Sequence, residues 1–445
     1  MAPTAAAAPK LLRLDIAKQW TGKMVNNGRC GTRWSPRELL TGDASFFPES
    51  LPLSVKRSVT SRFFMYEEQG ATKLDDAAGP TQVLQRSPAE LAELLHEGDM
   101  ANESSSEVKP VRHHHYWTSP VADVAPGLLQ AHLQGFQSVH HDNNPSAVLD
   151  PRGPSLWMGT SGSATQAHYD VADNVIVQLY GTKRIRCYPP EAATALHVFP
   201  DAHPRARKSQ VDWDAPDHER FGQFATLTPP VLDAVLQPGD AIRIPAFWFH
   251  HVENGRQQRQ CETAANGGVS GFRDLADSTM EQTLGPSVSF NLFALSDSMM
   301  IAQRIFQDAS QPFGRRHAAD NFSSAVEALR ALGWGLLEEL QQQDRSTDSP
   351  DQFIRTALLD TRYVPLQSSG DERHHESTRL EGLSLPEQEQ VAQCIARIMP
   401  YFAKLRETGG VGVQTLVVCH LLELWAVEMV GAGSVADAWE AVLRV

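Results

Sequence analysis

The residues with the clearest chemical potential are histidines and an aspartate from two distant segments. His168 and Asp170 stand two apart in "ATQAHYDVADN", and a later motif, "IPAFWFHHVENG", brings His250 and His251. Residues two apart in an extended strand share a face, so His168 and Asp170 can point at one ion. This spacing alone is also common for ordinary core or surface histidines. The pair therefore becomes a metal-site hypothesis only if a third ligand joins it.

The later motif can supply that third ligand. Only one of the adjacent residues His250 and His251 can face inward from an extended strand. Two histidines and one carboxylate on one side of a metal, with the other positions open, form the facial triad of non-haem Fe(II) oxygenases. A zinc-binding cupin and a purely structural role for "FHHV" are the alternatives.

A lysine after a glycine turn is the next chemical feature. In "VIVQLYGTKRIRCYPP", a two-residue loop that begins with Gly181 suits a type II′ hairpin that pairs Tyr180 with Lys183. Counting back in steps of two from Tyr180 reaches Asn174. We therefore expect Asn174 and Lys183 to face the same interior as the histidine–aspartate pair. A lysine inside a barrel needs an anion, unless its ammonium reaches solvent.

The elements that must position these residues follow from pattern changes along the chain. Short β-branched and aromatic runs bounded by glycine and proline dominate residues 111–295 and predict a jelly roll or double-stranded β-helix. We expect a disordered tail at 1–10, an N-terminal α/β lead-in at 11–110 and a helical region at 296–445. The predicted fold class is mainly β with α, a cupin-like core followed by C-terminal helices.

Several helical stretches are marked by period or by capping. "SPAELAELLHEG" begins with Ser87 and Glu90, which fit a capping box. The C-terminal helices are predicted in "SSAVEALRALGWGLLEELQQQ", "SLPEQEQVAQCIARIMPYFAKLRE" and "GVQTLVVCHLLELWAVEMVG". Stretches such as "TLVVCHLLELWAVEMV" are apolar over more than one face, which suits burial against the barrel or against a second copy in a homodimer.

Composition limits the classes of partner and compartment. The chain of 445 residues has a formal charge of −14, which disfavours a broad nucleic-acid-binding face. Its five cysteines are scattered and predict no disulfide framework. No segment reaches eighteen uninterrupted apolar residues, so we expect no membrane association and a cytoplasmic or nuclear location. The basic run His203–Lys208 is interpreted as a solvated loop, with contact to a phosphate or an acidic partner as the alternative. Histidines 113–115 alternate faces in a strand, so they are interpreted as exposed or partly packed rather than as a further metal site.

Four motifs resemble a known family. "AHYDVADNVIVQLYGTKRIRCYPP", "KSQVDWDAPDHERFGQF", "LQPGDAIRIPAFWFHHVENG" and "VSFNLF" are similar, in this order, to the JmjC-type 2-oxoglutarate oxygenases of the cupin fold. The likeness covers roughly residues 112–295. It is closest to the small hydroxylases, which include the asparaginyl hydroxylase of hypoxia-inducible factor and the hydroxylase of wybutosine synthesis in tRNA.

The resemblance implies specific roles for residues of this chain. It implies that His168, Asp170 and His250 bind Fe(II), and that Lys183 binds the distal carboxylate of 2-oxoglutarate. No catalytic residue beyond these ligands is implied. Residues that commonly assist the co-substrate in the family correspond here to Thr165, Asn174, Asn291 and Tyr116.

The substrate is less well defined by the sequence. The implied activity is hydroxylation coupled to conversion of 2-oxoglutarate to succinate, with a protein side chain as the first choice of substrate. The alternatives are a modified tRNA nucleoside, lysine demethylation, and a non-catalytic cupin that only binds. A long polar insert at residues 254–286 departs from the small hydroxylases, and loops at a barrel mouth often carry substrate recognition.

Overall fold

The structure is a computed structural model of the chain. It describes residues 8–12, 34–42, 46–61, 81–100, 113–132, 148–255, 285–310, 312–313, 322–344, 348–364 and 383–444. Most of the expected insert at 254–286, and residues 1–7 of the expected tail, lie outside the described residues.

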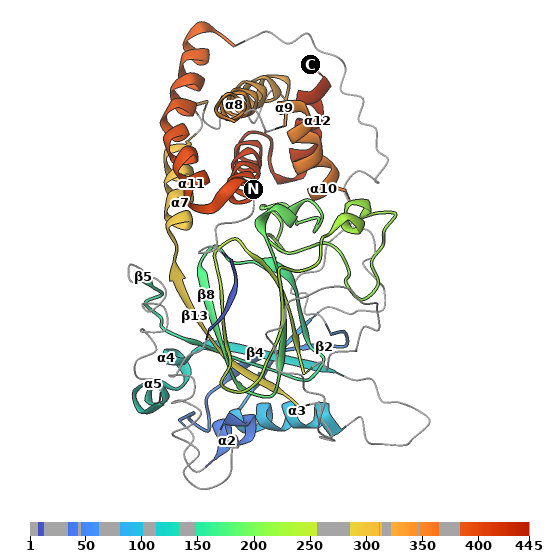
Figure 1. Cartoon of the computed structure of the whole chain (residues 1–445), viewed down its shortest axis with the longest axis vertical. Coiled ribbons are helices and arrows are strands. Elements are labelled where there is room, and N and C mark those ends of the chain that lie inside the picture. Colours follow the sequence, from blue (N-terminus) through green and yellow to red (C-terminus); the bar gives the residue numbers. More distant parts are fainter. Residues whose placement is uncertain are drawn as a thin grey trace, which may run out of the picture.

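Two antiparallel sheets form the centre of the molecule (Figure 1). The larger sheet has the strand order β1-β11-β8-β13-β6-β4-β2-β3, with β5 beside β13, and the smaller sheet has the order β10-β9-β12-β7. The strands are β1 Lys10–Leu12, β2 Leu53–Ser58, β3 Gln82–Arg86, β4 His114–Pro120, β5 Val148–Leu149, β6 Ser155–Gly159, β7 Ala164–Tyr169, β8 Asp173–Tyr180, β9 Lys183–Tyr188, β10 Leu232–Leu236, β11 Ala241–Ile244, β12 Phe249–Asn254 and β13 Ser287–Leu295.

Alternate residues of these strands meet in the space between the two sheets. Ile176 of β8 and Ile242 of β11, from the larger sheet, pack with Ile185 of β9, from the smaller sheet. On β8 the intervening residues Val175 and Val177 face the other way, into a separate apolar cluster. This alternation is that of strands buried on both faces, and the two-sheet arrangement confirms the predicted cupin-like fold.

The turn at Gly181 differs from its prediction. β8 and β9 do not pair as a hairpin, because β8 lies in the larger sheet and β9 in the smaller one. Gly181 has a φ of 65°, and a Cβ atom there would collide with the carbonyl oxygen of Pro286. The glycine thus permits a tight corner that carries the chain from one sheet to the other. Since the chain alternates between sheets, the nearest strand in sequence is not the nearest in space.

The N-terminal part extends the larger sheet instead of forming a layer of its own. β2 pairs with β4, and Lys10 of the expected tail pairs with Arg243 in β11. Ser87 and Glu90 form the predicted capping box, with Ser87 N–H donating to Glu90 (2.7 Å) and Glu90 N–H to Ser87 (3.3 Å). The helices of this part are α2 Pro36–Thr41, α3 Pro88–Met100, α4 Val121–Val124 and α5 Pro126–His132.

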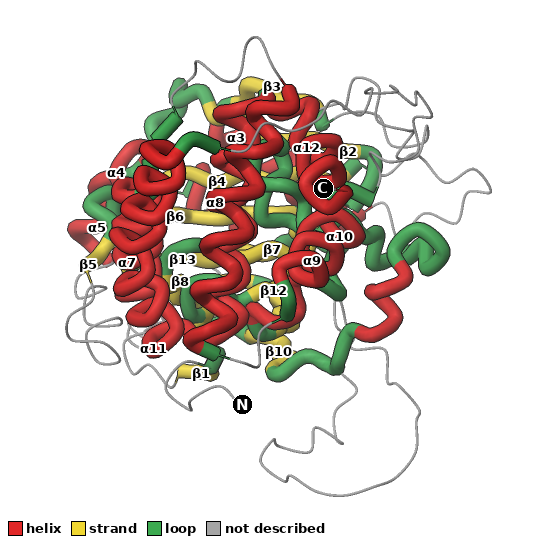
Figure 2. The backbone as a smooth tube through the Cα atoms, turned by 90° about the horizontal axis from the view of Figure 1, so that it is seen from above, coloured by secondary structure: helices red, strands yellow, loops and turns green. Residues whose placement is uncertain are grey.

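The C-terminal helices lie at one end of the barrel (Figure 1), and Figure 2 looks down on them from that end. Tyr169, Tyr188 and Phe249 of the smaller sheet belong to the same apolar cluster as the buried side of these helices. A kink at Gly410 (φ 81°) divides α11, so its halves correspond to the two helices predicted there. The helices are α7 Asp297–Asp308, α8 Phe322–Gln343, α9 Pro350–Phe353, α10 Asp360–Arg362, α11 Leu385–Val430 and α12 Val435–Arg444.

Helix α11 is long and apolar enough to pass a test of length and composition for a membrane span. Two-thirds of its most apolar window (67%) is buried inside the protein. That burial is typical of a core helix.

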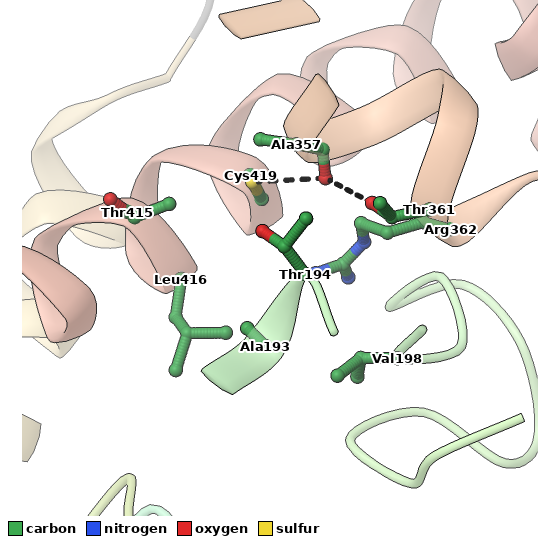
Figure 3. A pocket seen from close by; sticks show the side chains of 9 residues that line it. All are labelled: Ala193, Thr194, Val198, Ala357, Thr361, Arg362, Thr415, Leu416 and Cys419. Atoms are coloured by element: carbon green, nitrogen blue, oxygen red, sulfur yellow. Dashed lines mark hydrogen bonds between the residues drawn. The ribbon is translucent and has the colours of Figure 1, made fainter. Parts of the chain in front are cut away.

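A buried ionic network joins the barrel to the helices. We call it the junction network, and it consists of Arg362, Asp201 and Glu423. The Arg362 guanidinium donates to Glu423 (Nε to Oε1, 2.7 Å) and to Asp201 (Nη2 to Oδ2, 2.6 Å). Asp201 N–H donates to the other Glu423 oxygen (2.6 Å). Figure 3 shows Arg362 beside a small cavity that Cys419 and Thr194 also line.

Candidate metal centre

Three possible metal ligands converge inside the barrel. His168 lies on β7, Asp170 follows that strand directly, and His250 lies opposite His168 on β12. One ligand atom from each lies within 4.8 Å of the others. The two imidazole rings are 4.2 Å apart between centroids, and His250 Nε2 is 3.6 Å from Asp170 Oδ2. Neighbouring strands thus bring together residues 80 positions apart in sequence.

Both imidazoles are oriented by the backbone. His168 Nδ1–H donates to the Gln166 carbonyl oxygen (2.8 Å), and His250 Nδ1–H donates to that of Trp248 (3.2 Å). A carbonyl oxygen only accepts, so each Nδ1 carries the proton and each Nε2 keeps a free lone pair. Burial, together with the charge of the nearby His250, lowers the pKa of His168 to about 3. His168 is therefore neutral at pH 7, as a metal ligand must be.

Asp170 is positioned by its neighbours. Asn174 Nδ2 donates to Asp170 Oδ2 (3.4 Å), and the Phe247 N–H donates to the Asp170 carbonyl oxygen (2.7 Å). Phe247 has a φ of 65°, which is strained for a bulky residue. Phe247 lies in the turn that leads into β12. This turn places the start of β12 beside the end of β7.

Polar side chains also line the interior away from the ligands. Lys183 is buried, and its Nζ donates to Ser289 Oγ at 2.5 Å. Burial lowers the pKa of Lys183 to about 7. The side-chain oxygens of Asn174 and Asn291 are buried and have no hydrogen-bond partner among the described residues. A buried lysine without a carboxylate, beside unused amide oxygens, fits a site that receives a polar anionic ligand.

Tyr116 and Thr165 lie at the same end of the barrel as the ligands. The Tyr116 hydroxyl hydrogen-bonds the Thr165 side chain, and burial raises the pKa of that hydroxyl above its ordinary value. The charge of Asp170 acts in the same direction, which places Tyr116 near the ligand group. The Tyr116 ring also contacts Trp157, with centroids 5.7 Å apart.

The adjacent histidines have separate environments. His251 points to the other face of β12, where its ring stacks on Trp213 with centroids 4.6 Å apart. Arg186 Nη2 lies 3.2 Å from His251 Nδ1. His251 does not belong to the ligand group that His250 joins. The alternation predicted for an extended strand therefore describes this pair.

Two residues near the ligands were not predicted. Ser289 was missed, although it lies two positions before Asn291 on β13 and alternation alone places both on one face. Lys208 was included in a run interpreted as a solvated loop, yet it forms an isolated β-bridge with His168. No local pattern reveals this bridge, because it joins a loop to a strand 40 residues earlier. The small cavity of Figure 3 is not lined by any candidate ligand.

Parts of the chain resemble known proteins in sequence. Residues 82–269 match the family model of a cupin-like domain. Over 120 residues the chain is 35% identical to the tRNA wybutosine-synthesizing protein 5 of Danio rerio, covering 27% of this chain and 29% of that protein. Over 98 residues it is 31% identical to the lysine-specific demethylase 8 of Xenopus tropicalis, covering 22% and 21%. The chain thus matches less than a third of the length of either relative.

Solved structures were also compared. The Escherichia coli ribosomal oxygenase YcfD in complex with cobalt and succinic acid is 15% identical, with a TM-score of 0.29, covering 77% of this chain and 65% of that one. The family match and the two-sheet fold define a cupin-like protein. More narrowly, residues 82–269 match a cupin-like domain, and segments of the chain are similar in sequence to tRNA wybutosine-synthesizing protein 5 and to lysine-specific demethylase 8.

Proposed function

We propose that the chain is an Fe(II)- and 2-oxoglutarate-dependent hydroxylase. The observation that carries the proposal is the convergence of His168, Asp170 and His250 inside the barrel, with both histidine Nε2 atoms free and one carboxylate beside them. Two imidazoles and one carboxylate suit a ferrous ion with open positions. Zinc remains a possible occupant of such a donor set, so the metal must be tested directly.

Different residues of the chain would bind the metal and the co-substrate. His168, Asp170 and His250 would hold the iron, and Asn174 keeps the Asp170 carboxylate oriented. Lys183 would bind the far carboxylate of 2-oxoglutarate. When bound, iron and 2-oxoglutarate supply the oxidising chemistry for a C–H bond, with succinate and carbon dioxide as co-products.

Other residues would shape the co-substrate pocket. Ser289 holds the Lys183 ammonium in place, and the unused oxygen of Asn291 can accept from a polar group of the ligand or from an ordered water. Tyr116 and Thr165 form a hydroxyl pair near the ligands that can donate to a carboxylate. The apolar residues of both sheets limit the access of water.

A protein side chain is the proposed substrate. The net charge of −14 is unfavourable for a large nucleic-acid surface. The likeness to tRNA wybutosine-synthesizing protein 5 supports a tRNA nucleoside as the second candidate, and the likeness to lysine-specific demethylase 8 supports demethylation. Both likenesses cover a short segment.

Succinate formation tests the proposal. The purified chain, loaded anaerobically with Fe(II), should convert labelled 2-oxoglutarate to succinate when oxygen is admitted, even slowly without substrate. Omission of iron and the Asp170→Ala variant should remove this activity. A chain that binds neither iron nor 2-oxoglutarate would instead be a non-catalytic cupin, and one that is active only with zinc would have a different chemistry.

A further inference from the structure

Lys208 lies directly beside the candidate metal centre. Tyr169 N–H donates to the Arg207 carbonyl oxygen (3.3 Å), and Ser209 N–H donates to that of Ala167 (2.7 Å). These two bonds flank the bridge between His168 and Lys208, which is antiparallel. In such a non-hydrogen-bonded pair the two side chains share one face and approach closely. The Lys208 side chain therefore lies on the face from which His168 reaches the other ligands.

Lys56 approaches from the opposite sheet. It pairs with Tyr116 across β2 and β4, so their side chains also share one face. The Tyr116 hydroxyl contacts Thr165, and its pKa responds to the charge of Asp170. Lys56 is consequently on the side of the larger sheet that faces the ligands.

The two lysines lie close enough for their charges to interact, and no described residue gives either of them a carboxylate partner. Both are half-buried, and neither forms an ion pair or a side-chain hydrogen bond with a described residue. Burial lowers the pKa of each, and the charges of Lys56, Arg205 and Arg207 lower that of Lys208 further. Like charges that are partly desolvated and adjacent are unfavourable unless an anion joins them.

We propose that Lys56 and Lys208 bind carboxylates of an acidic peptide and so present a neighbouring residue of that peptide to the metal centre. This inference rests on the proposed hydroxylase function and names its substrate class. Lys208 lies beside the smaller sheet and Lys56 belongs to the larger one, and both are near His168. They can therefore bind acidic residues that precede and follow the peptide residue that reacts.

A peptide fits these surroundings better than a nucleic acid. Lys56 and Lys208, with Arg205 and Arg207 near Lys208, form one compact group of cations, whereas a phosphate backbone is usually bound along an extended basic stripe. Asp214 accepts a hydrogen bond from Ser61 (3.4 Å), and the Ala164 N–H at the start of β7 donates to the Ser61 carbonyl oxygen (2.7 Å). Asp214 therefore lies near the start of β7, the strand that carries His168.

Three pools of short synthetic peptides test the inference. All have the same mixed central residues, and their flanking positions are acidic, neutral or basic. Retention on the immobilised chain measures binding, and mass spectrometry after incubation with Fe(II) and 2-oxoglutarate measures added oxygen. The variants are Lys56→Glu/Lys208→Glu and a control with the same change in net charge, Lys10→Glu/Lys404→Glu, which alters exposed lysines on β1 and α11.

The expected result is a preference of about tenfold or more for the acidic pool, which salt weakens. The site variant should lose or reverse this preference, while the control variant should keep it. Equal binding of all pools by the wild-type chain, or an unchanged preference in the site variant, would overturn the inference.

The test also separates this inference from the proposed reaction. Acidic peptides that bind selectively but gain no oxygen would support the lysine site and contradict the hydroxylase function. If peptides gain oxygen regardless of their charge, the hydroxylase function is supported and the lysine site is contradicted. Oxygen added to tRNA, with all peptide pools inert, would overturn the acidic-peptide inference in favour of a nucleic acid.

Discussion

The barrel interior and the junction network both bury charged side chains, but they satisfy them to different degrees. In the junction network, Arg362 meets two carboxylates at hydrogen-bond distance, and Glu423 also accepts a backbone N–H. In the interior, Lys183 meets only a serine hydroxyl. Amide oxygens near it have no partner among the described residues.

This difference distinguishes charged residues that stabilise the fold from charged residues that bind a ligand. Buried polar groups normally have hydrogen-bond partners. A buried cluster whose groups all have partners in the protein needs no ligand, whereas a cluster with groups that lack partners indicates a bound ligand or water. The junction network is therefore expected to govern stability, and the interior to govern binding. The predictions below test that division.

The largest expected effect is loss of the metal site. Asp170→Ala removes the only carboxylate of the ligand group, and two neutral imidazoles cannot balance the charge of a ferrous ion. Iron content after dialysis and succinate formation should both fall to background, with the fold retained by circular dichroism. Wild-type iron content in this variant would contradict the assignment of Asp170 as a ligand.

The second prediction concerns stability. Arg362→Met leaves two buried carboxylates without their cation, so the free energy of unfolding should fall by about 3–5 kcal/mol. Urea denaturation measures this loss. A triple variant that also replaces Asp201 and Glu423 with leucine should recover much of it, because no buried charge is left unpaired. If Arg362→Met left the unfolding midpoint unchanged, the network would not be structural.

The third prediction is a loss of co-substrate affinity with a defined dependence on pH. Lys183→Ala should raise the 2-oxoglutarate requirement about 10- to 100-fold, with iron retained, because a charged hydrogen bond is lost. In the free chain burial holds the pKa of Lys183 at about 7, so the ammonium is deprotonated above that pH. A bound dianion favours the protonated form and raises this pKa.

Affinity of the wild-type chain should accordingly be highest below pH 7 and fall by up to about tenfold for each pH unit above it. Calorimetric titration across this range measures the fall, and Lys183→Arg should flatten it because arginine stays charged. An affinity that increases with pH would exclude Lys183 as the anion-binding group.

The smallest expected effect concerns the second histidine. His251→Ala should retain iron and change succinate formation by no more than about threefold, since the His251 ring stacks on Trp213 outside the ligand group. His250→Ala, its matched partner, should lose both. The reverse result for these two variants would show that the strand places His251 inward.

Much of this arrangement could be predicted from local sequence. Short β-branched and aromatic runs between glycines and prolines indicated the strands, and alternation along an extended strand placed His250 and His251 on different faces. The helices after residue 296 followed from their apolar spacing, and Gly410 explains why two were expected where one kinked helix exists. These features depend on near neighbours in sequence, which a pattern can capture.

What sequence could not predict depends on distant pairing. The Gly181 turn had the composition of a hairpin, but the two strands beside it find partners in different sheets. The bridge of Lys208 to His168 requires the loop after β9 to return along β7. The pairing of β2 with β4, on either side of the expected boundary at residue 110, is likewise a contact between distant segments. All three features depend on how segments that are distant in sequence pair with one another, which local sequence does not show.

The junction network connects a loop of the barrel to the C-terminal helices. Gln210 Nε2 donates to the Arg362 carbonyl oxygen (2.9 Å), so the segment 201–210 is attached to α10 at both of its ends, and Lys208 lies between these attachments. The helices and this loop are therefore one structural unit. A chimaera that exchanges the C-terminal helices alone is expected to displace Lys208, whereas one that exchanges helices and loop together is expected to keep Lys208 in place relative to α10.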